Sequence, residues 1–267
     1  MPSGTQSKRR RAAAAAGPPP VRSTERRQAS PRVLFAAAAV LALIVVAVVL
    51  VVVLSGSGSS TADVPARGSL ANGLPGAADV QRLLAGIPQH GDVLGSASAP
   101  VTMIEYVDLQ CPYCQQFETQ AMTTLIPRYV RPGEAKVEMR PIAFIGPDSV
   151  RGRVAALAAG LQNKLFNFAQ LLYLNQGTEN TGWLSDDMVK ATAASIPGLD
   201  VPKLLDARGS RSVSSSAQEL DSQASGDNVQ STPTILVGKR GKKPVPVSLS
   251  SPADSESVAA AIAAALR

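Results

Sequence analysis

The stretch that decides the fold runs Val101-Thr-Met-Ile-Glu-Tyr-Val107 and, after three further residues, Cys111-Pro-Tyr-Cys114. Its first part is a nearly continuous apolar run, which predicts a strand buried on both faces of a sheet. From Cys111 to Val130 the apolar residues follow helical spacing, and Pro127 is expected to kink or end that helix. The pattern therefore places two cysteines at the first turn of a helix that follows a buried strand.

The cysteine pair predicts redox chemistry. The chain has two cysteines and one histidine, His90, too few for a disulfide-stapled scaffold, a four-cysteine zinc site or a histidine-rich metal site. A thiolate at a helix N-terminus lies beside unpaired backbone N–H groups and the positive end of the helix dipole, which lower its pKa. Pro112 suits that first turn because no N–H is needed there. The alternative interpretations are that the two cysteines stand close together by chance or that they form half of a metal site. The sequence offers no second cysteine pair and no nearby histidine as further ligands for a metal.

Two cysteines on one helical turn can close a disulfide without moving the chain. We predict that Cys111, at the exposed helix start, is the reactive sulfur, because Cys114 points towards the core with Phe117 and Ala121. Alkylation near neutral pH is therefore expected to label Cys111 first.

Two features far from the cysteines strengthen the redox interpretation. Glu105 interrupts the apolar strand, so its carboxyl is expected to be buried, which raises its pKa towards the range used in proton transfer. A solvent-facing Glu105 on an edge strand is the alternative. Thr232-Pro233 precedes a second apolar run, and a proline at the mouth of a buried strand suggests a cis bond in a tight turn.

The folded body is predicted to be a mixed α/β unit over residues 87–267. A half-exposed strand at Lys136–Arg140 is followed by a helical block of about 149–225. Helices in this block are marked by apolar faces or caps: Val150, Val154, Leu157 and Leu161; Leu165, Phe168 and Leu172; the cap Ser185; and the cap Asp200. Short strands at 234–237 and 245–247 flank a basic tip at 239–243. Ser251 is expected to cap a last helix, whose apolar face is Val258, Ile262 and Leu266.

The charge of the chain is concentrated at its N-terminus. Lys and Arg number 26 against 20 Asp and Glu, a net charge of +6. Residues 1–32 hold eight of the basic side chains and one acid, so this segment carries +7 and the remainder sums to −1. A basic nucleic-acid-binding domain is therefore not expected. The low-complexity composition of residues 1–32 predicts a disordered cytoplasmic tail.

Residues 33–54 are 22 residues without a charge or a hydrogen-bonding side chain, which predicts one transmembrane helix. A cleavable signal peptide is the alternative, but its apolar region is usually shorter and ends in a small-residue cleavage site. The basic residues before the span place the N-terminus in the cytoplasm and residues 55–267 outside, where disulfide chemistry is permitted. Residues 55–86 are rich in Gly, Ser and Pro and predict a flexible linker, with a short polar helix at about 77–85.

Together these residues resemble the thioredoxin-fold family, and within it the DsbA-like thiol–disulfide oxidoreductases of the membrane-anchored bacterial type. The resemblance covers about residues 87–267. It rests on Ala99-Pro-Val-Thr102 leading into Glu105-Tyr-Val-Asp108, on Cys111-Pro-Tyr-Cys114, on the helical block and on Thr232-Pro-Thr234. It implies a thioredoxin fold with an inserted helical subdomain, which plain thioredoxin and the short glutaredoxins lack.

The resemblance also implies roles for single residues. Cys111 matches the family's nucleophile and Cys114 its buried partner in a redox-active disulfide. Glu105 matches the buried acid, and Pro233 matches the cis-proline that faces the disulfide, with Thr232 beside it pairing with extended substrate. Within the active-site motif, Tyr113 follows Pro112 where the best-known strongly oxidising members have His. No cofactor and no metal are implied.

The implied partners are unfolded or partly folded secreted proteins and a membrane quinone-linked thiol oxidase that restores the disulfide. A second hypothesis is a non-catalytic peptide-binding or chaperone-like module that kept the fold, against which the presence of both sulfurs and Glu105 argues. His90 is assigned to the surface or a hairpin. Trp183 and the aromatic residues at 166, 168 and 173 are assigned to the core of the helical block.

Overall fold

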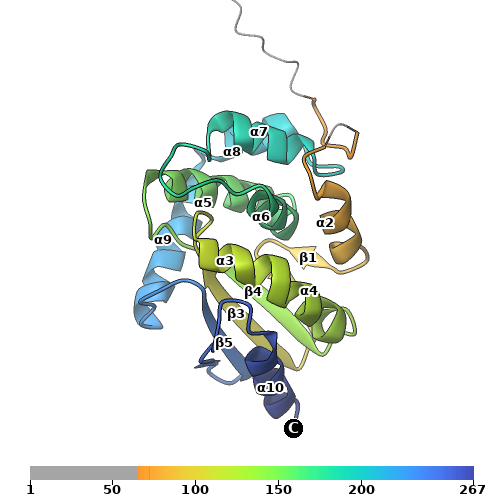
Figure 1. Cartoon of the computed structure of the whole chain (residues 1–267), viewed down its shortest axis with the longest axis vertical. Helices are drawn as coiled ribbons and strands as arrows, with labels where there is room; N and C mark the ends of the chain where they lie inside the picture. Colours follow the sequence, from red (N-terminus) through yellow and green to blue (C-terminus); the bar gives the residue numbers. More distant parts are fainter. Residues whose placement is uncertain (1–64, 72) are drawn as a thin grey trace, which may run out of the picture. The chain divides into compact units, whose positions relative to one another are not determined.

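The computed structural model of the chain describes residues 65–71 and 73–267, which form a mixed sheet with helices on both faces (Figure 1). The sheet has six strands in the order β1-β2-β4-β3-β5-β6. The strands are β1 (Gln89–His90), β2 (Val93–Leu94), β3 (Val101–Val107), β4 (Ala135–Pro141), β5 (Thr234–Lys239) and β6 (Val245–Pro246). Strands β3 and β4 are parallel, and every other neighbouring pair is antiparallel. The predicted strand at 101–107 is thus confirmed as a central strand.

Helices make up most of the rest of the described chain. They are α2 (Ala77–Leu84), α3 (Pro112–Gln116), α4 (Met122–Leu125), α5 (Pro147–Gly160), α6 (Leu165–Leu174), α7 (Asp186–Ala194), α8 (Val201–Ala207), α9 (Arg211–Gly226) and α10 (Ser255–Leu266). Helices α5 to α9 lie between β4 and β5 in the chain and correspond to the predicted insertion. Ser185 and Asp200 cap α7 and α8 as predicted, through hydrogen bonds from Met188 N and Lys203 N.

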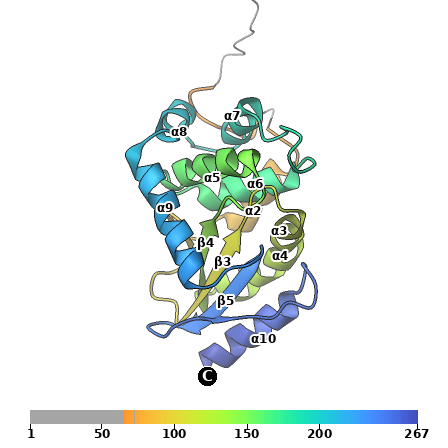
Figure 2. The ribbon, with the colours of Figure 1, turned by 90° about the vertical axis from the view of Figure 1, so that its left-hand side faces the viewer.

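The alternation of side chains along β3 divides the core into two parts. Met103 and Val107 face the main core, which the segment α3–α4 and helix α10 cover. Ile104 and Tyr106 face a smaller cluster that includes Ala224 of α9. Figure 2 shows α9 and α10 on opposite sides of the sheet. The cysteine-bearing helix therefore packs on the face of β3 that also carries Glu105.

The helix after Cys111 does not end at Pro127, although an end there was one of the two outcomes predicted for that residue. It runs on to Val130 through two π-helical turns, η1 (Phe117–Ala121) and η2 (Ile126–Val130). In η2 the Arg131 N–H reaches back five residues to Ile126 O at 2.9 Å. Pro127 stands at the start of this wider turn, where the backbone hydrogen bonds change from i→i−4 to i→i−5. Because of this change, the helix tolerates the missing N–H of Pro127 and continues.

The folded body begins earlier than the predicted residue 87. Gly68 N donates to Leu199 O at 2.8 Å, and α2 buries Val80 and Leu84 in the main core. Arg131 donates to the carbonyls of Leu83 and Ala85. The predicted short helix at 77–85 is confirmed as α2. It is part of the body and not of the linker because one of its faces is apolar enough to pack against α6.

Two details of the predicted helices were wrong. Val150 and Leu161 are exposed, because α5 turns its small residues Gly152, Ala155 and Ala159 towards its neighbours and these allow close packing. The last helix is capped by Asp254 and not by Ser251, since the Asp254 carboxylate accepts the N–H of Ser257 at 2.9 Å.

The transmembrane prediction is not addressed by these elements. Among residues 65–71 and 73–267, no helix is both long and apolar enough to cross a membrane. The predicted tail at 1–32, the predicted span at 33–54 and the first part of the predicted linker lie outside the described residues.

Candidate active site

Both cysteines lie at the start of the helix that follows the central strand, as predicted. Cys111 is the N-cap residue of α3, and Pro112 occupies the first turn. The two sulfurs are free thiols in this structure. Cys111 is only 5% exposed, so the prediction that it is exposed was wrong, although Cys114 is buried more completely at 0%. Tyr113 between them is 57% exposed and marks the open side of the motif.

The two thiols have opposite pKa shifts. A hydrogen bond from the Cys114 thiol, followed by contacts with Thr232 and the backbone N–H groups of Cys114 and Tyr113, lowers the pKa of Cys111 from 9.0 to about 6, against the opposing effect of burial. Burial raises the pKa of Cys114 well above its ordinary value. At neutral pH Cys111 is therefore a thiolate and Cys114 a thiol. The helix N-terminus contributes as expected from the sequence, but the neighbouring thiol is the larger cause.

The loop before β5 closes over Cys111. The Thr232–Pro233 peptide bond is cis, as predicted. The Cys111 thiol lies 3.4 Å from the carbonyl oxygen of Thr232, a residue 121 positions away in the chain. Thr232 and Pro233 are half-buried, so part of each remains accessible beside the sulfur. This loop is positioned to present a backbone edge to a chain bound at Cys111.

Glu105 is fully buried, which confirms the prediction from the apolar strand. Its register partners are Met139 of β4 and Ile235 of β5, so its strand neighbours bring no charge. Burial raises the pKa of Glu105 well above its ordinary value, and the charge of Glu118 and a hydrogen bond with Glu118 raise it further. Two carboxyl groups can share a hydrogen bond only if one of them carries a proton.

Glu118 lies in η1 and is also fully buried. Burial raises the pKa of Glu118 to about 7, while hydrogen bonds with Glu105 and Gln170 hold it lower than burial alone would. Gln170 of α6 donates its amide N–H to Glu118 Oε2. The site therefore contains a pair of acids at the position where the sequence predicted one.

A network of amide and carboxylate side chains holds the segment between β3 and Cys111. Asp108 Oδ2 accepts the N–H groups of Phe144 and Ile145, and its Oδ1 accepts that of Gln110. The Gln110 side chain donates to Ser149 Oγ at 3.0 Å, and its oxygen accepts the N–H of Asn180 at 2.8 Å. The insertion thus contacts the residue directly before the reactive cysteine.

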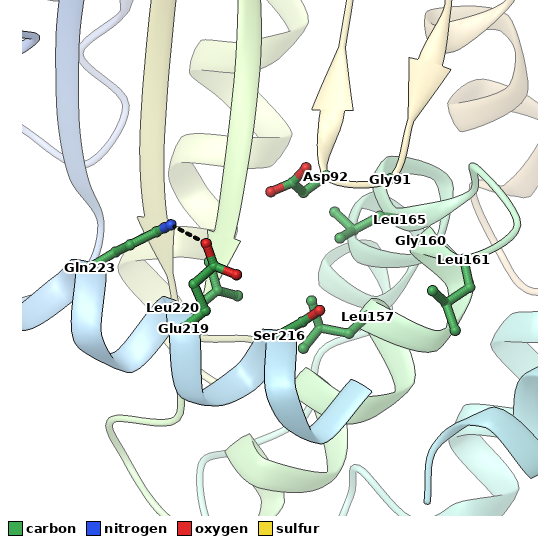
Figure 3. A pocket seen from close by; sticks show the side chains of 10 residues that line it. All are labelled: Gly91, Asp92, Leu157, Gly160, Leu161, Leu165, Ser216, Glu219, Leu220 and Gln223. Carbon is green, nitrogen blue, oxygen red and sulfur yellow. Dashed lines mark hydrogen bonds between the residues drawn. The ribbon is translucent and has the colours of Figure 1, made fainter. Parts of the chain in front are cut away.

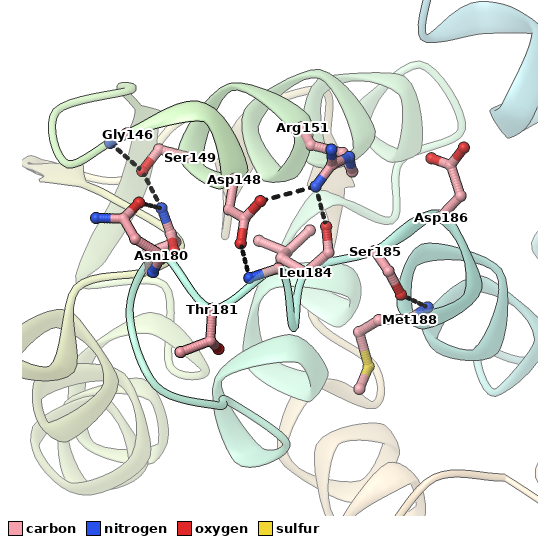
Figure 4. A network of polar contacts seen from close by, with 12 residues as sticks. Gly146, Asp148, Ser149, Arg151, Asn180, Thr181, Leu184, Ser185, Asp186 and Met188 are labelled. Atoms are coloured by element: carbon pink, nitrogen blue, oxygen red, sulfur yellow. Dashed lines mark hydrogen bonds and ion pairs between the residues drawn. The ribbon is translucent and has the colours of Figure 1, made fainter. Parts of the chain in front are cut away.

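Figure 4 shows how the same loop of the insertion is held on its other side. Asp148 accepts from Arg151 Nη1 at 2.8 Å and from the Gly182 N–H at 2.9 Å. Arg151 Nη1 also donates to the Leu184 carbonyl at 2.8 Å. Because these contacts join the start of α5 to the loop before α7, they keep Asn180 in place against Gln110.

Comparison with known proteins identifies the family. The family model described as thioredoxin matches residues 89–261. The chain belongs to the thioredoxin family. Within this family it is similar to a probable disulfide bond formation protein D of Bacillus cereus, with 26% identity over 147 residues that cover 54% of this chain and 68% of that protein.

Two solved structures of thioredoxin-fold proteins show the same architecture. The oxidised BdbD of Bacillus subtilis matches with a TM-score of 0.58 and 22% identity, covering 67% of this chain and 97% of that one. The DsbA of Chlamydia trachomatis matches with a TM-score of 0.56 and 16% identity, covering 66% and 92%. With its dithiol at the helix start, this member of the thioredoxin family is a DsbA-like thiol–disulfide oxidoreductase.

The structure brings Cys111, Cys114 and the Thr232–Pro233 loop together and places Glu105 on the face of β3 that the cysteine-bearing helix covers. It adds three residues that the sequence analysis missed. Glu118 stands four residues after Cys114, on the same side of the helix, and this spacing was a usable signal. Gln170 is a polar residue inside the apolar helix α6, a weaker signal of the same kind as Glu105. Gln110 carries no signal in the sequence, because its partners come from separate parts of the insertion.

The remaining aromatic residues and His90 lie where the sequence placed them. Phe166, Phe168 and Tyr173 are fully buried, Trp183 packs half-buried against the core, and His90 is exposed in the β1–β2 hairpin. A small cavity of about 190 Å³ lies between α5, α9 and that hairpin (Figure 3). Leu157, Leu165 and Leu220 line it together with the acids Asp92 and Glu219, and neither cysteine reaches it.

Proposed function

We propose that this chain is a membrane-tethered thiol–disulfide oxidoreductase that acts outside the cytoplasm on secreted or cell-surface proteins. The observation that carries the exchange chemistry is the opposite shift of two neighbouring sulfurs: the pKa of Cys111 is lowered to about 6, and that of Cys114 is raised. A low pKa makes Cys111 both a good nucleophile at neutral pH and a good leaving group in a mixed disulfide.

In the oxidising direction a substrate thiolate attacks Cys111 Sγ of the disulfide form. A bond forms between the two sulfurs, the Cys111–Cys114 bond breaks, and its electron pair goes to Cys114 Sγ. A second substrate thiolate then attacks the substrate sulfur of the mixed disulfide, which leaves the substrate oxidised and Cys111 reduced. In the reducing direction Cys114 attacks the mixed disulfide at Cys111 and expels the substrate thiolate.

The raised pKa of Cys114 makes a proton acceptor or donor necessary at this step. Cys114 must lose a proton when it attacks and gain one when it leaves, and it is fully buried. Glu105 is the buried acid that we assign to this proton transfer. Its burial on the Cys114 side of the sheet and its raised pKa support the assignment.

Substrate is proposed to bind as an extended segment beside the cis-proline loop. Backbone pairing with Thr232 next to Pro233 would tolerate many sequences, as an enzyme acting on unfolded proteins requires. The exposed rings of Tyr113 and Phe144 offer apolar contacts for such a segment; Phe144 is held near the motif by its N–H bond to Asp108.

The membrane assignment rests on the sequence. The uncharged span at 33–54 and the basic residues before it support a single-pass anchor with a cytoplasmic N-terminus. The name of the Bacillus cereus relative, disulfide bond formation protein, supports the oxidising direction. A membrane quinone-linked thiol oxidase would then restore the Cys111–Cys114 disulfide.

A redox titration of the full chain against glutathione tests the activity. A reduction potential of about −120 mV would mark a strong oxidant, and one of about −270 mV would mark a reductant. Cys111→Ser is the control and is expected to show no exchange with glutathione or reduced substrate protein. Wild-type protein that exchanges no faster than this control would contradict the proposed activity.

Protease added to protoplasts of a bacterial host that express the full chain tests the topology. Removal of the Cys111–Cys114 domain from outside is the expected result. Complete protection of the domain until the membrane is opened would contradict the proposed orientation.

A further inference from the structure

Gln110, the residue directly before the reactive cysteine, is fully buried, and each of its polar groups is hydrogen-bonded. Its backbone N–H donates to Asp108 Oδ1 at 2.8 Å, and its carbonyl accepts a side-chain N–H of Gln176 at 2.6 Å. Its side-chain oxygen accepts the N–H of Asn180 at 2.8 Å. Its side-chain nitrogen donates to Ser149 Oγ at 3.0 Å and to Asn180 Oδ1 at 3.3 Å. All of these bonds except the one to Asp108 join Gln110 to the helical insertion.

The peptide group between Gln110 and Cys111 is held on both sides. The insertion holds its carbonyl through Gln176, and its N–H, that of Cys111, donates to Asp108 O at 3.0 Å. On the helix side the Cys111 carbonyl accepts the N–H of Gln115 at 3.0 Å, where Cys111 begins α3 with an extended backbone. Because a peptide group turns as one plane, these bonds fix the direction in which the Cys111 side chain leaves the backbone.

The loop of the insertion that reaches Gln110 has features that cost stability. Within residues 65–71 and 73–267, the buried Oε1 of Gln176 has no hydrogen-bond partner. Asn180 has a φ of 55°, a left-handed conformation that is uncommon outside glycine. Gly146 lies beside Asn180 (Figure 4), and a Cβ atom at position 146 would overlap Asn180 Oδ1. Unpaired buried polar groups and rare backbone conformations concentrate at functional sites, so the contact with Gln110 has more than a packing role.

The charge on Cys111 depends on where its sulfur lies. The thiol of Cys114, the contact with Thr232 and the backbone N–H groups of Cys114 and Tyr113 lower the pKa of Cys111 to about 6. Each of these contacts requires the sulfur to lie at the start of α3 and beside the loop before β5. Hydrogen bonds weaken steeply as their angles become less favourable. A rotation of the peptide group after Gln110 would therefore raise the pKa of Cys111 towards its ordinary value of 9.0.

The charged and titratable groups around this peptide group have partners or lie at the surface. Asp108 accepts three backbone N–H groups, and Asp148 pairs with Arg151. Burial raises the pKa of Tyr173, which stays neutral and donates its O–H to Asp108 O. Glu179 is exposed, and neither α3 nor the segment 228–234 contains a charged residue. Substitutions among the neutral residues of the network leave these charges unchanged, so a shift in the pKa of Cys111 would report a change in geometry.

We propose that Gln110 is a positioning residue through which the helical insertion fixes the place of the Cys111 sulfur, between the start of α3 and the loop before β5. Gln176 and Asn180 act through Gln110 and are positioning residues as well. The insertion thus sets the reactivity of the site. The inference rests on the exchange chemistry proposed for Cys111.

The experiment measures the thiolate of Cys111 against pH by its ultraviolet absorbance, in the reduced full chain in detergent, with Cys111→Ser as the blank. Gln176→Leu removes the bond to the Gln110 carbonyl and also the unpaired buried oxygen, so its two effects on stability oppose one another. We expect its denaturation midpoint to stay close to that of wild type. Its thiolate midpoint should rise from about 6 by about 0.5–1 pH unit, the effect of one typical hydrogen bond.

Gly146→Ala tests the same inference without removing a polar group. The atoms nearest to the added Cβ belong to the end of the Asn180 side chain, which can rotate away, so the chain is expected to fold. Asn180 then loses its side-chain contact with the Gln110 amide, and the thiolate midpoint should rise. Asn180→Gly keeps the backbone N–H and suits the left-handed conformation, so it should raise the midpoint by less.

Gln162→Leu is the matched control. Gln162 is a half-buried amide of the same insertion, and its side chain bonds the backbone of Asp200 at 2.9 and 3.0 Å. This substitution should lower the denaturation midpoint and leave the thiolate midpoint unchanged. A less stabilised thiolate also favours the disulfide form, so the equilibrium with glutathione at pH 7 should shift towards the disulfide about three- to fivefold in Gln176→Leu and not in Gln162→Leu.

A thiolate midpoint that stays at the wild-type value in Gln176→Leu and Gly146→Ala overturns the inference and makes the network a structural contact. If either variant does not fold, Asn180→Gly decides by the same criterion. An equal shift in Gln162→Leu also overturns it, because any loosening of the insertion would then act on the sulfur. Failure of the proposed activity is a different result: the wild-type thiolate would titrate as expected, yet the protein would exchange disulfides no faster than Cys111→Ser.

Discussion

Neighbouring residues of the central strand send polar side chains to opposite faces of the sheet, and the two side chains meet opposite environments. Tyr106 donates its O–H to Asp227 at 2.8 Å and accepts from Arg140 at 2.6 Å, and Arg140 also contacts Glu138. On the other face, among residues 65–71 and 73–267, Glu118 is the charged group that acts on Glu105, and no cation compensates the two acids. On the Tyr106 face, positive and negative charges compensate one another. On the Glu105 face, the described part of the chain places two acids together without a positive charge to compensate them.

The difference shows which network stabilises the fold and which serves chemistry. On the Tyr106 face each charge has an opposite charge and each donor an acceptor, and burial raises the pKa of Tyr106 to about 12, so the group stays neutral. Buried acids without a cation cost stability, and groups kept at such a cost concentrate at functional sites. Since Cys114 shares the helix side of Glu118, we propose that the acid pair serves the active site.

The largest expected effect is on the rate at which Cys114 resolves a mixed disulfide, and it is expected from a change on the Glu105 face of the sheet. Glu105→Gln should slow resolution of a mixed disulfide at Cys111 by about 100-fold, within the range for loss of a positioned general acid–base. Its stability should equal or exceed that of wild type, because an amide replaces a buried acid. Stopped-flow rates and denaturation midpoints measure both. If Glu105→Gln loses stability but keeps its rate, Glu105 stabilises the fold and takes no part in the exchange reaction.

The matching change on the other face is Arg140→Met. It leaves Asp227 and Glu138 without their cation, and both are only about one-fifth exposed. We expect a loss of about 1–3 kcal/mol in the free energy of unfolding, reduced from that of a fully buried pair by partial exposure to water. Resolution by Cys114 should keep its wild-type rate. A slowed resolution would show that the Tyr106 face contributes to the site.

The pH dependence of stability should differ between the acid pair and its neutral replacement. Because folding raises the carboxyl pKa values, the pair's favourable contribution is complete below the unfolded value near 4.5 and is lost as the pH rises through the folded value of about 7 for Glu118. Wild type should therefore lose stability from pH 4.5 to 7 relative to Glu105→Gln/Glu118→Gln. The disulfide form is the sample to measure, since neither sulfur titrates in it. Parallel stability curves would contradict the raised values.

The smallest effect is expected from Tyr106→Phe. The ring and its contact with Arg140 remain, and the hydrogen bonds of the O–H are lost. A typical cost is about 1 kcal/mol in the free energy of unfolding. Urea denaturation measures it. A cost above that of Arg140→Met would mean that the hydroxyl, and not the cation, organises this face.

Local patterns in the sequence predicted much of the site because they act over a few residues. The apolar run around Glu105, the cysteines at a helix start and Thr232-Pro233 before a strand each specify a local geometry, and the structure shows all three. The cap of α7 at Ser185 was predictable for the same reason. The course of the helix through Pro127 was not predictable, because the π-helical turn that accommodates this residue depends on how the whole helix packs.

The sequence by itself determined that two cysteines stand at a helix start behind a buried strand with one acid in it, since strand burial, helix spacing and turn chemistry are properties of neighbouring residues. Tertiary structure decided what surrounds them. It paired Glu105 with Glu118, brought Gln170 and the loop at Asn180 to the site, and set α2 against α6 as part of the body. These contacts join residues from 13 to over 60 positions apart, and no local pattern encodes which distant side chains will meet when both are buried.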